Sequence, residues 1–126
     1  MGKRILVVDD ESSVGTLLAF SLRQRGYDVQ SVLSAAAGLE RAGQQRFDLV
    51  ILDVALPGID GIEACRLLKA LPGYEDTPVI MISSRSDSVT VESARSAGAA
   101  DYLVKPFTGE ELLRRIEEQL LRPFSR

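Results

Sequence analysis

Histidine and tryptophan are both missing from the 126-residue chain, and cysteine occurs once. Without histidine, the protein has no imidazole of its own that could act as a general base, a metal ligand or a phosphate carrier. The single Cys65 excludes an internal disulfide and is typical of a reducing compartment, so we expect a cytoplasmic location. No apolar run approaches the ~20 residues that cross a bilayer, and we expect no membrane association.

Charges of the two signs are nearly balanced, with 15 Lys and Arg against 18 Asp and Glu and a formal net charge of −3. Direct nucleic-acid binding is not expected, because it requires a basic surface. Hydrophobic residues make up 45% of the chain, which is enough for the core of one ordinary domain. We expect a single domain over residues 1–126, with a core of about 4–121 and a tail or the start of a linker at 122–126.

Short apolar segments recur along the chain, and each is typical of a strand. Those at 5–8, 49–52 and 79–82 are continuous, as in strands that are buried on both faces of a parallel sheet. The segment at 27–32 alternates with polar residues and is typical of an edge strand, and a fifth strand is expected at 102–104. Helical patterns fill the gaps, so the sequence predicts an α/β fold of five βα units, doubly wound around a parallel sheet.

Three of the expected helices have a clear apolar stripe that should face the core. Residues 34–37 open another helix, and 89–97 form a weaker one. Gly26, Gly43 and Gly98 stand where helices should end. The stripes are Val14, Leu17, Leu18 and Leu22 in the first helix, Ile62, Cys65 and Leu68 in the third, and Leu112, Ile116 and Leu120 in the fifth.

Polar residues follow four of the predicted strands: Asp9 and Asp10 the first, Asp53 the third, Ser83 the fourth and Lys105 the fifth. In a parallel sheet these ends meet at one edge, where such folds bind ligands. Ordinary structural interpretations exist, with Asp10 as a helix N-cap, Asp53 as a turn residue and Ser83 as a strand-end hydroxyl. Lys105 is harder to explain, because a lysine that ends an apolar strand needs a charged partner. One functional interpretation covers all of them.

That interpretation is metal-assisted phosphoryl transfer. Crowded carboxylates of Asp9, Asp10 and Asp53 repel one another, and a divalent cation relieves the repulsion. A site made only of oxygen ligands favours Mg²⁺ over zinc, with Mn²⁺ as an alternative. An aspartate carboxylate can attack phosphorus, while the metal and a lysine neutralise the transferred group. A serine hydroxyl can donate a hydrogen bond to a phosphoryl oxygen.

Other phosphate chemistries fit less well. No G-x-x-x-x-G-K-[ST] sequence follows the first strand, and no G-x-G-x-x-G occurs, so the chain lacks the signatures of P-loop and dinucleotide sites. A flavin-phosphate loop would not carry the acids of residues 9–11. An aspartate phosphatase of the D-x-D type needs a second acid two residues after the nucleophile, where this chain has Ala55.

Three segments at the strand ends carry a resemblance: 7–11 (VVDDE), 53–61 (DVALPGIDG) and 98–107 (GAADYLVKPF). In this order and spacing they resemble the receiver domains of response regulators in two-component signalling, and the likeness extends over about residues 4–121. The resemblance implies a flavodoxin-like sheet with strand order 2-1-3-4-5.

The resemblance also implies a role for each polar residue. Asp53 would be the phosphorylated nucleophile. Asp10 and Asp53 would hold Mg²⁺ directly, Asp9 mainly through water, and the backbone carbonyl of Ala55 would add a ligand. After phosphorylation, Lys105 would pair with the phosphoryl group, Ser83 would close on it, and Tyr102 would be the aromatic switch. The resemblance also implies that the Lys105–Pro106 peptide bond is cis.

As a receiver, the chain would take the phosphoryl group from a sensor histidine kinase or a histidine phosphotransfer protein. The face of the fourth helix, fifth strand and fifth helix would then bind an unknown output partner or effector domain, with a phosphorylation-dependent homodimer as one outcome. It would catalyse its own phosphorylation and dephosphorylation but act mainly as a switch. Two alternatives remain open: a pseudo-receiver that is never phosphorylated, and a small phosphatase that uses an acyl phosphate.

Overall fold

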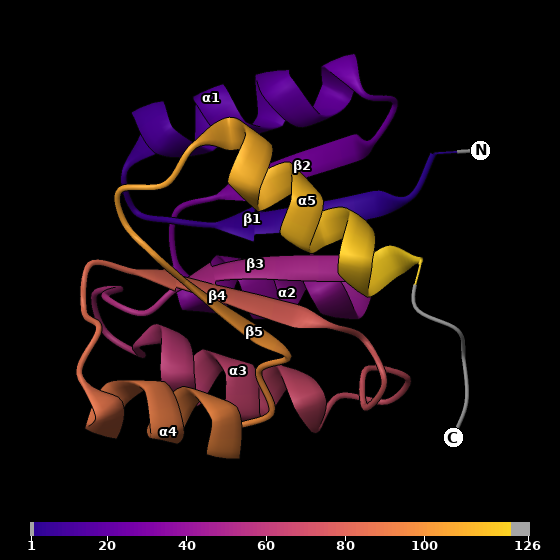
Figure 1. Ribbon diagram of the computed structural model, residues 1–126. Coiled ribbons are helices and arrows are strands. Elements are labelled where there is room, and N and C mark those ends of the chain that lie inside the picture. The colour runs from indigo at the N-terminus through magenta and orange to yellow at the C-terminus, as the bar shows by residue number, and fades with distance from the viewer. Residues whose placement is uncertain (1, 122–126) are drawn as a thin grey trace.

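The computed structural model describes residues 2–121, so the tail or linker predicted at 122–126 lies outside the described residues. Strands and helices alternate along the chain (Figure 1). Within the described residues, no helix is both long and apolar enough to cross a membrane. The strands are β1 (Arg4–Val8), β2 (Asp28–Val32), β3 (Leu49–Asp53), β4 (Val79–Ser83) and β5 (Asp101–Val104). The helices are α1 (Ser12–Gln24), α2 (Ala35–Gln44), α3 (Gly61–Lys69), α4 (Ser88–Ser96) and α5 (Gly109–Leu120).

The strands form one parallel sheet in the order β2-β1-β3-β4-β5, which confirms the predicted fold. The register places Ile51 of β3 between Val7 of β1 and Ile80 of β4. Every residue of β3 and β4 is buried, as their continuous apolar sequences predicted. The strand β2 lies at one edge of the sheet, also as predicted, and of its residues only Val29 and Val32 are buried.

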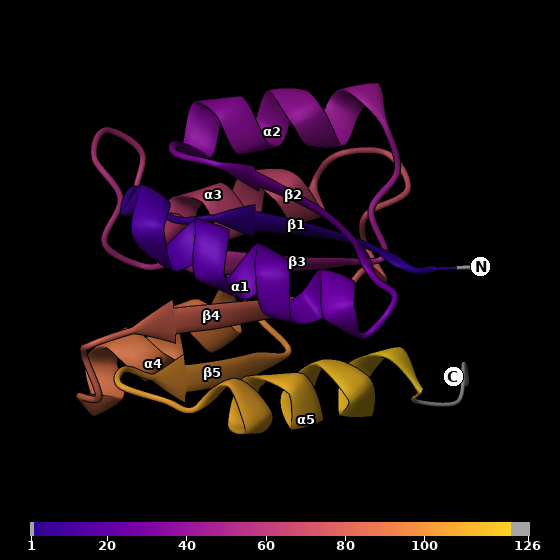
Figure 2. The ribbon, with the colours of Figure 1, turned by 90° about the horizontal axis from the view of Figure 1, so that it is seen from above.

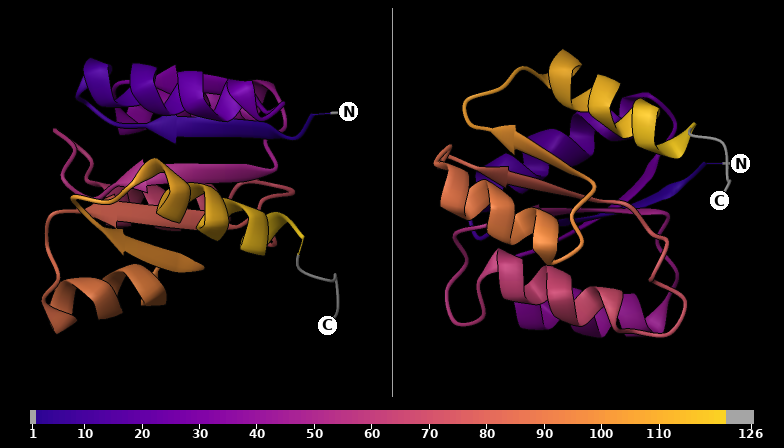
Figure 3. Two further views of the ribbon diagram at one scale, coloured as in Figure 1. Left: turned by 45° about the horizontal axis from the view of Figure 1, so that its top comes forward. Right: turned by 60° about the horizontal axis from the view of Figure 1, so that its bottom comes forward.

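Helices cover both faces of the sheet, with α1 and α5 on one face and α2, α3 and α4 on the other (Figures 2 and 3). Successive side chains of β1 point to opposite faces, so Ile5 and Val7 join one core while Leu6 and Val8 join the other. The helix that follows β1, α1, covers one face of the sheet, whereas the helix that follows β3, α3, covers the other. In sheets of this kind, ligands bind beyond the carboxyl ends of the two strands where the order reverses.

The apolar stripes of α3 and α5 lie against the cores, but the stripe of α1 was predicted partly wrong. Leu18 and Leu22 are buried, whereas Leu17 is 68% exposed. The buried positions of α1 include Gly15 and Ala19, which share the helical spacing of three and four residues with Leu18 and Leu22. Leu17 is out of phase with that spacing, and its hydrophobicity alone suggested the core.

Two of the three predicted helix ends at glycine are correct. Gly26 and Gly98 follow α1 and α4 with φ angles of 92° and 110°, the left-handed conformation that glycine adopts without strain. The prediction for Gly43 is wrong, because this residue lies inside the last turn of α2. That helix instead ends where Gln45 turns into an extended conformation.

Side chains cap four of the five helices. Ser34, Asp60, Asp87 and Thr108 each accept a hydrogen bond from the backbone N–H three residues later. Hydrogen bonds from the Thr90 hydroxyl and backbone N–H hold the pKa of the Asp87 carboxyl at about 2. The exception is α1, whose N-cap is Glu11 and has no side-chain cap, so the N-cap interpretation of Asp10 is wrong.

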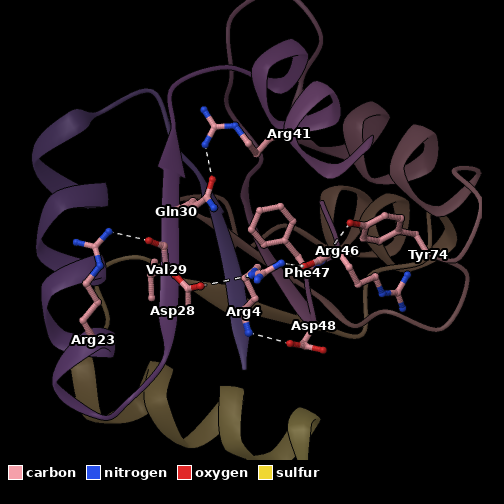
Figure 4. Close-up of polar contacts among 10 residues, drawn as sticks. All are labelled: Arg4, Arg23, Asp28, Val29, Gln30, Arg41, Arg46, Phe47, Asp48 and Tyr74. Atoms are coloured by element: carbon pink, nitrogen blue, oxygen red, sulfur yellow. Dashed lines mark hydrogen bonds and ion pairs between the residues drawn. The ribbon is translucent and has the colours of Figure 1, made fainter. Parts of the chain in front are cut away.

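Polar contacts connect the loops at the end of the sheet where the parallel strands begin (Figure 4). The buried Tyr74 hydroxyl accepts a hydrogen bond from the Phe47 N–H at 3.2 Å, and the Ala42 carbonyl lies 2.9 Å from it as an acceptor. The Arg46 guanidinium stacks over the Tyr74 ring at 4.8 Å. The backbone N–H of Arg4 donates to Asp48 at 2.7 Å. These contacts hold the loops at this end of the sheet together. The clustered acids lie at the opposite end, where the strands finish.

Candidate functional site

The carboxyl edge of the sheet brings together the acidic residues that the sequence singled out. Asp9 follows β1, and Asp53 is the last residue of β3; both are buried, while the adjacent Asp10 is exposed. One carboxylate oxygen from each of the three lies within 4.8 Å of the other two. Neighbouring strands in parallel register produce this clustering, because β1 and β3 pair directly and end at the same height.

Both oxygens of Asp53 have partners. Its Oδ1 accepts a hydrogen bond from the Ala55 N–H at 3.1 Å, and its Oδ2 accepts one from the Lys105 ammonium at 2.9 Å. The side chain is only 6% exposed. The Ala55 contact belongs to the turn that follows β3, and it fixes the direction of the carboxylate relative to that turn.

Asp9 is fully buried, and only one of its two carboxylate oxygens accepts a hydrogen bond from the described residues. Its Oδ1 accepts a hydrogen bond from the Glu11 N–H at 2.9 Å, whereas its Oδ2 has no hydrogen-bond partner among residues 2–121. The Lys105 ammonium lies 3.5 Å from this oxygen, which is an ion-pair distance without hydrogen-bond geometry. Burial raises the pKa of the Asp9 carboxyl, and the charge of Asp53 adds to this. A buried carboxylate oxygen beside two other carboxylates is the arrangement that a divalent cation satisfies.

Lys105 follows β5 and contacts three acidic side chains. Its ammonium lies 2.9 Å from Asp53, 3.5 Å from Asp9 and 3.9 Å from Glu11. Burial alone would lower the pKa of Lys105, but the hydrogen bond and charge of Asp53, with the charges of Asp9 and Glu11, raise it above its ordinary value. The Lys105–Pro106 peptide bond is cis. Because its pKa is raised, the Lys105 ammonium is positively charged at neutral pH.

Ser83 and Tyr102 meet through the backbone of Arg85 and do not join the carboxylate cluster directly. The buried Ser83 hydroxyl accepts a hydrogen bond from the Arg85 N–H at 3.0 Å. The Tyr102 hydroxyl donates to the Arg85 carbonyl at 2.7 Å. Sequence reasoning did not give Arg85 this linking position, because the contacts use its backbone and leave no signature in the residue type.

The missing hydrogen bond at the buried Asp9 Oδ2 leads to a stability prediction. We expect Asp9→Asn to raise the free energy of unfolding at neutral pH, without divalent cations, by about 0.5–2 kcal/mol. The raised pKa means that the folded state disfavours ionised Asp9. This penalty is absent below the ordinary value of 3.8 and grows as the pH rises through the folded-state value. Urea denaturation of both proteins at acidic and at neutral pH measures the difference.

The same variant carries its own control. Mg²⁺ should stabilise the native sequence more than Asp9→Asn, because only the native site offers a charged carboxylate oxygen that accepts no hydrogen bond within the described part of the chain. A variant that is less stable than the native protein at neutral pH in the absence of metal would contradict the prediction.

Comparison with known proteins identifies the family. The family model of the response regulator receiver domain matches residues 5–117, most of the chain. The chain belongs to this family. The receiver domain is 39% identical over 122 residues to the DNA-binding response regulator MtrA of Mycobacterium tuberculosis (strain ATCC 25618 / H37Rv), an alignment that covers 97% of this chain and 52% of MtrA. It thus spans about half the length of the curated relatives it matches.

Solved structures share the fold of this receiver domain. The chemotaxis protein CheY4 of Vibrio cholerae superposes with a TM-score of 0.92 at 29% identity, covering 95% of this chain and 100% of CheY4. The receiver domain of sensor histidine kinase PA1611 from Pseudomonas aeruginosa PAO1 gives a TM-score of 0.87 at 32% identity, covering 95% of this chain and 98% of that one. That structure holds a magnesium ion coordinated in its active site cleft.

Proposed function

We propose that this receiver domain is a Mg²⁺-dependent switch that accepts a phosphoryl group on Asp53 from a phosphohistidine of a partner. Because this chain has no histidine of its own, the phosphohistidine belongs to another protein, for which we propose a sensor histidine kinase or a histidine phosphotransfer protein. The observation that carries the proposal is the buried Asp9 Oδ2, which lacks a hydrogen bond within a cluster of three carboxylates beside Lys105.

The residues of the cluster divide the work. Asp10 and Asp53 would hold the cation through their carboxylates, Asp9 would act mainly through water, and the Ala55 backbone carbonyl would be a further ligand. Mg²⁺ suits these oxygen ligands, with Mn²⁺ as an alternative. When bound, the metal supplies charge neutralisation on the transferred phosphoryl oxygens.

The transfer itself uses Asp53. An oxygen of its carboxylate forms a bond to phosphorus as the bond from phosphorus to the histidine nitrogen breaks, which leaves an acyl phosphate on the domain. Lys105 already donates to the Asp53 carboxylate and can follow the new oxygens with the same ammonium. Water later hydrolyses the acyl phosphate. The domain thus catalyses its own phosphorylation and dephosphorylation, although its output is binding.

Signal output follows from the contacts of Arg85. Ser83 moves from the Arg85 N–H toward the phosphoryl group, and Tyr102 responds because it binds the carbonyl of the same residue. The face of α4, β5 and α5 then binds an output partner or effector domain, or a second phosphorylated copy. We propose that residues 1–126 are one receiver unit that works in the cytoplasm and does not itself bind nucleic acid. The pseudo-receiver alternative has less support, because the acids and Lys105 are all present.

The test uses the native chain with acetyl phosphate as a small phosphoryl donor. Intact mass spectrometry should show a gain of one phosphoryl group with Mg²⁺ and none when the metal is chelated. Peptide mapping should then locate the group on the segment that contains Asp53. A folded protein that gains no phosphoryl group under any condition would overturn the proposal in favour of a pseudo-receiver. Continuous release of phosphate from simple monoesters would instead favour a phosphatase.

A further inference from the structure

Glu11 departs from the pattern that the other helices follow. Four helices begin with Ser, Asp or Thr, whose side chains cap the first turn, but α1 begins with Glu11, whose side chain makes no cap. Glutamate is not among the residues that cap helices well. Positions that break a local rule without local compensation are expected at functional sites. The exception occurs at the one helix that begins beside Asp9 and Asp10.

The Glu11 carboxylate faces Lys105 instead of its own helix. Its Oε1 lies 3.9 Å from the Lys105 ammonium, and its backbone N–H is anchored to the buried Asp9 at 2.9 Å. The Glu11 side chain is 64% exposed, whereas the other two acids on Lys105, Asp9 and Asp53, are 0% and 6% exposed. Glu11 therefore contacts Lys105 from the solvent side and is not part of the Asp9, Asp10 and Asp53 cluster.

We infer that Glu11 is a positioning residue that holds the Lys105 ammonium and restrains phosphorylation of Asp53 by free anionic donors. This inference rests on the proposed function. A phosphoryl group that arrives at Asp53 needs the same ammonium that Glu11 contacts, so the two anions compete for it. Glu11 also places a negative charge on the solvent side of Lys105, where it would repel an anionic donor that approaches Asp53. Both effects act in the same direction and are electrostatic.

The size of the effect follows from exposure. Solvent and salt strongly reduce the interaction energy of two unit charges about 4 Å apart near a protein surface. We therefore expect removal of the Glu11 charge to change the rate of Asp53 phosphorylation by about threefold to tenfold. Screening is weak at an ionic strength of about 0.01 M and strong at about 1 M. A change in hydrogen bonding at the helix N-cap would not depend on salt in this way.

The experiment compares initial rates of phosphorylation by acetyl phosphate in the native chain, Glu11→Gln and Glu40→Gln, with Mg²⁺ saturating for each. Glu40 lies exposed on α2, so its replacement makes the same change of charge on an element that carries none of the clustered acids or Lys105. Glu11→Gln should react about threefold to tenfold faster at low ionic strength, with less than half of that gain at high ionic strength. Glu40→Gln should match the native rate.

A third variant separates positioning from helix stability. Glu11→Ser supplies a better N-cap, so it should raise the thermal unfolding midpoint and also accelerate phosphorylation. A native chain that is phosphorylated while Glu11→Gln reacts at the same rate or more slowly overturns the inference and leaves the proposed function intact. A rate gain in Glu11→Gln that salt does not reduce also overturns it. A native chain that is not phosphorylated at all overturns the proposed function, and the inference with it.

Discussion

Asp53→Asn is expected to abolish phosphorylation by acetyl phosphate. Asparagine has almost the same shape, but its amide oxygen is a far weaker nucleophile than a carboxylate, and the variant removes one charge from the cluster that would hold the metal. The side-chain oxygen can still accept the hydrogen bond from the Ala55 N–H that Oδ1 accepts now. The variant should therefore fold, and the gain of one phosphoryl group in the intact mass should disappear completely.

The matched control is Asp76→Asn, which makes the same chemical change at an exposed residue of the loop between α3 and β4. This variant should gain the phosphoryl group at the native rate. Circular dichroism of both variants checks that they are folded. A folded Asp53→Asn protein that still gains one phosphoryl group would place the acceptor elsewhere in the chain.

The second large effect is expected at Gly61, the first residue of α3. A Cβ atom at this position would lie 2.0 Å from the Asp53 carbonyl oxygen and 2.8 Å from the Val54 Cα, both of which are backbone atoms. The Gly61 N–H also donates to the Val54 carbonyl at 2.8 Å, so the helix start is pressed against the segment that carries Asp53. Gly61→Ala must push this segment away.

We expect Gly61→Ala to lower the free energy of unfolding by about 1–3 kcal/mol, the usual cost of overpacking. Phosphorylation should slow by about 100-fold, because small displacements of reacting groups have effects of that size. Urea denaturation and the mass assay measure the two effects. Gly43→Ala is the control, since a Cβ there meets nothing within 4 Å and the residue lies in α2. It should stabilise the protein by about 0.5–1 kcal/mol without changing the rate. Equal behaviour of the two variants would refute the packing argument.

Much of the fold could be predicted because three of the strands, β1, β3 and β4, contain continuous apolar runs. The parallel order then brings Asp9, Asp53 and Lys105 to one edge, although they are far apart in the sequence. The error at Leu17 has a different origin, because a single hydrophobic residue does not reveal its phase on a helix when small residues such as Gly15 and Ala19 occupy the buried face.

Other features depend on contacts that no local pattern contains. Tyr74 lies in a loop, and its hydroxyl binds backbone groups 27 and 32 residues away, which no periodicity indicates. Glu11 was visible in the sequence as part of an acidic segment. Its position facing Lys105 became evident only once the two chain segments were placed side by side.

The Asp87 cap of α4 is insensitive to pH except under strongly acidic conditions. A depressed carboxyl pKa contributes stability above its unfolded value, and this contribution is lost only as the pH falls through the folded-state value, which for Asp87 is about 2. The start of α4 is therefore equally well anchored at every pH that a living cell maintains. The chain also has no histidine, so no imidazole near this helix changes its charge around neutral pH.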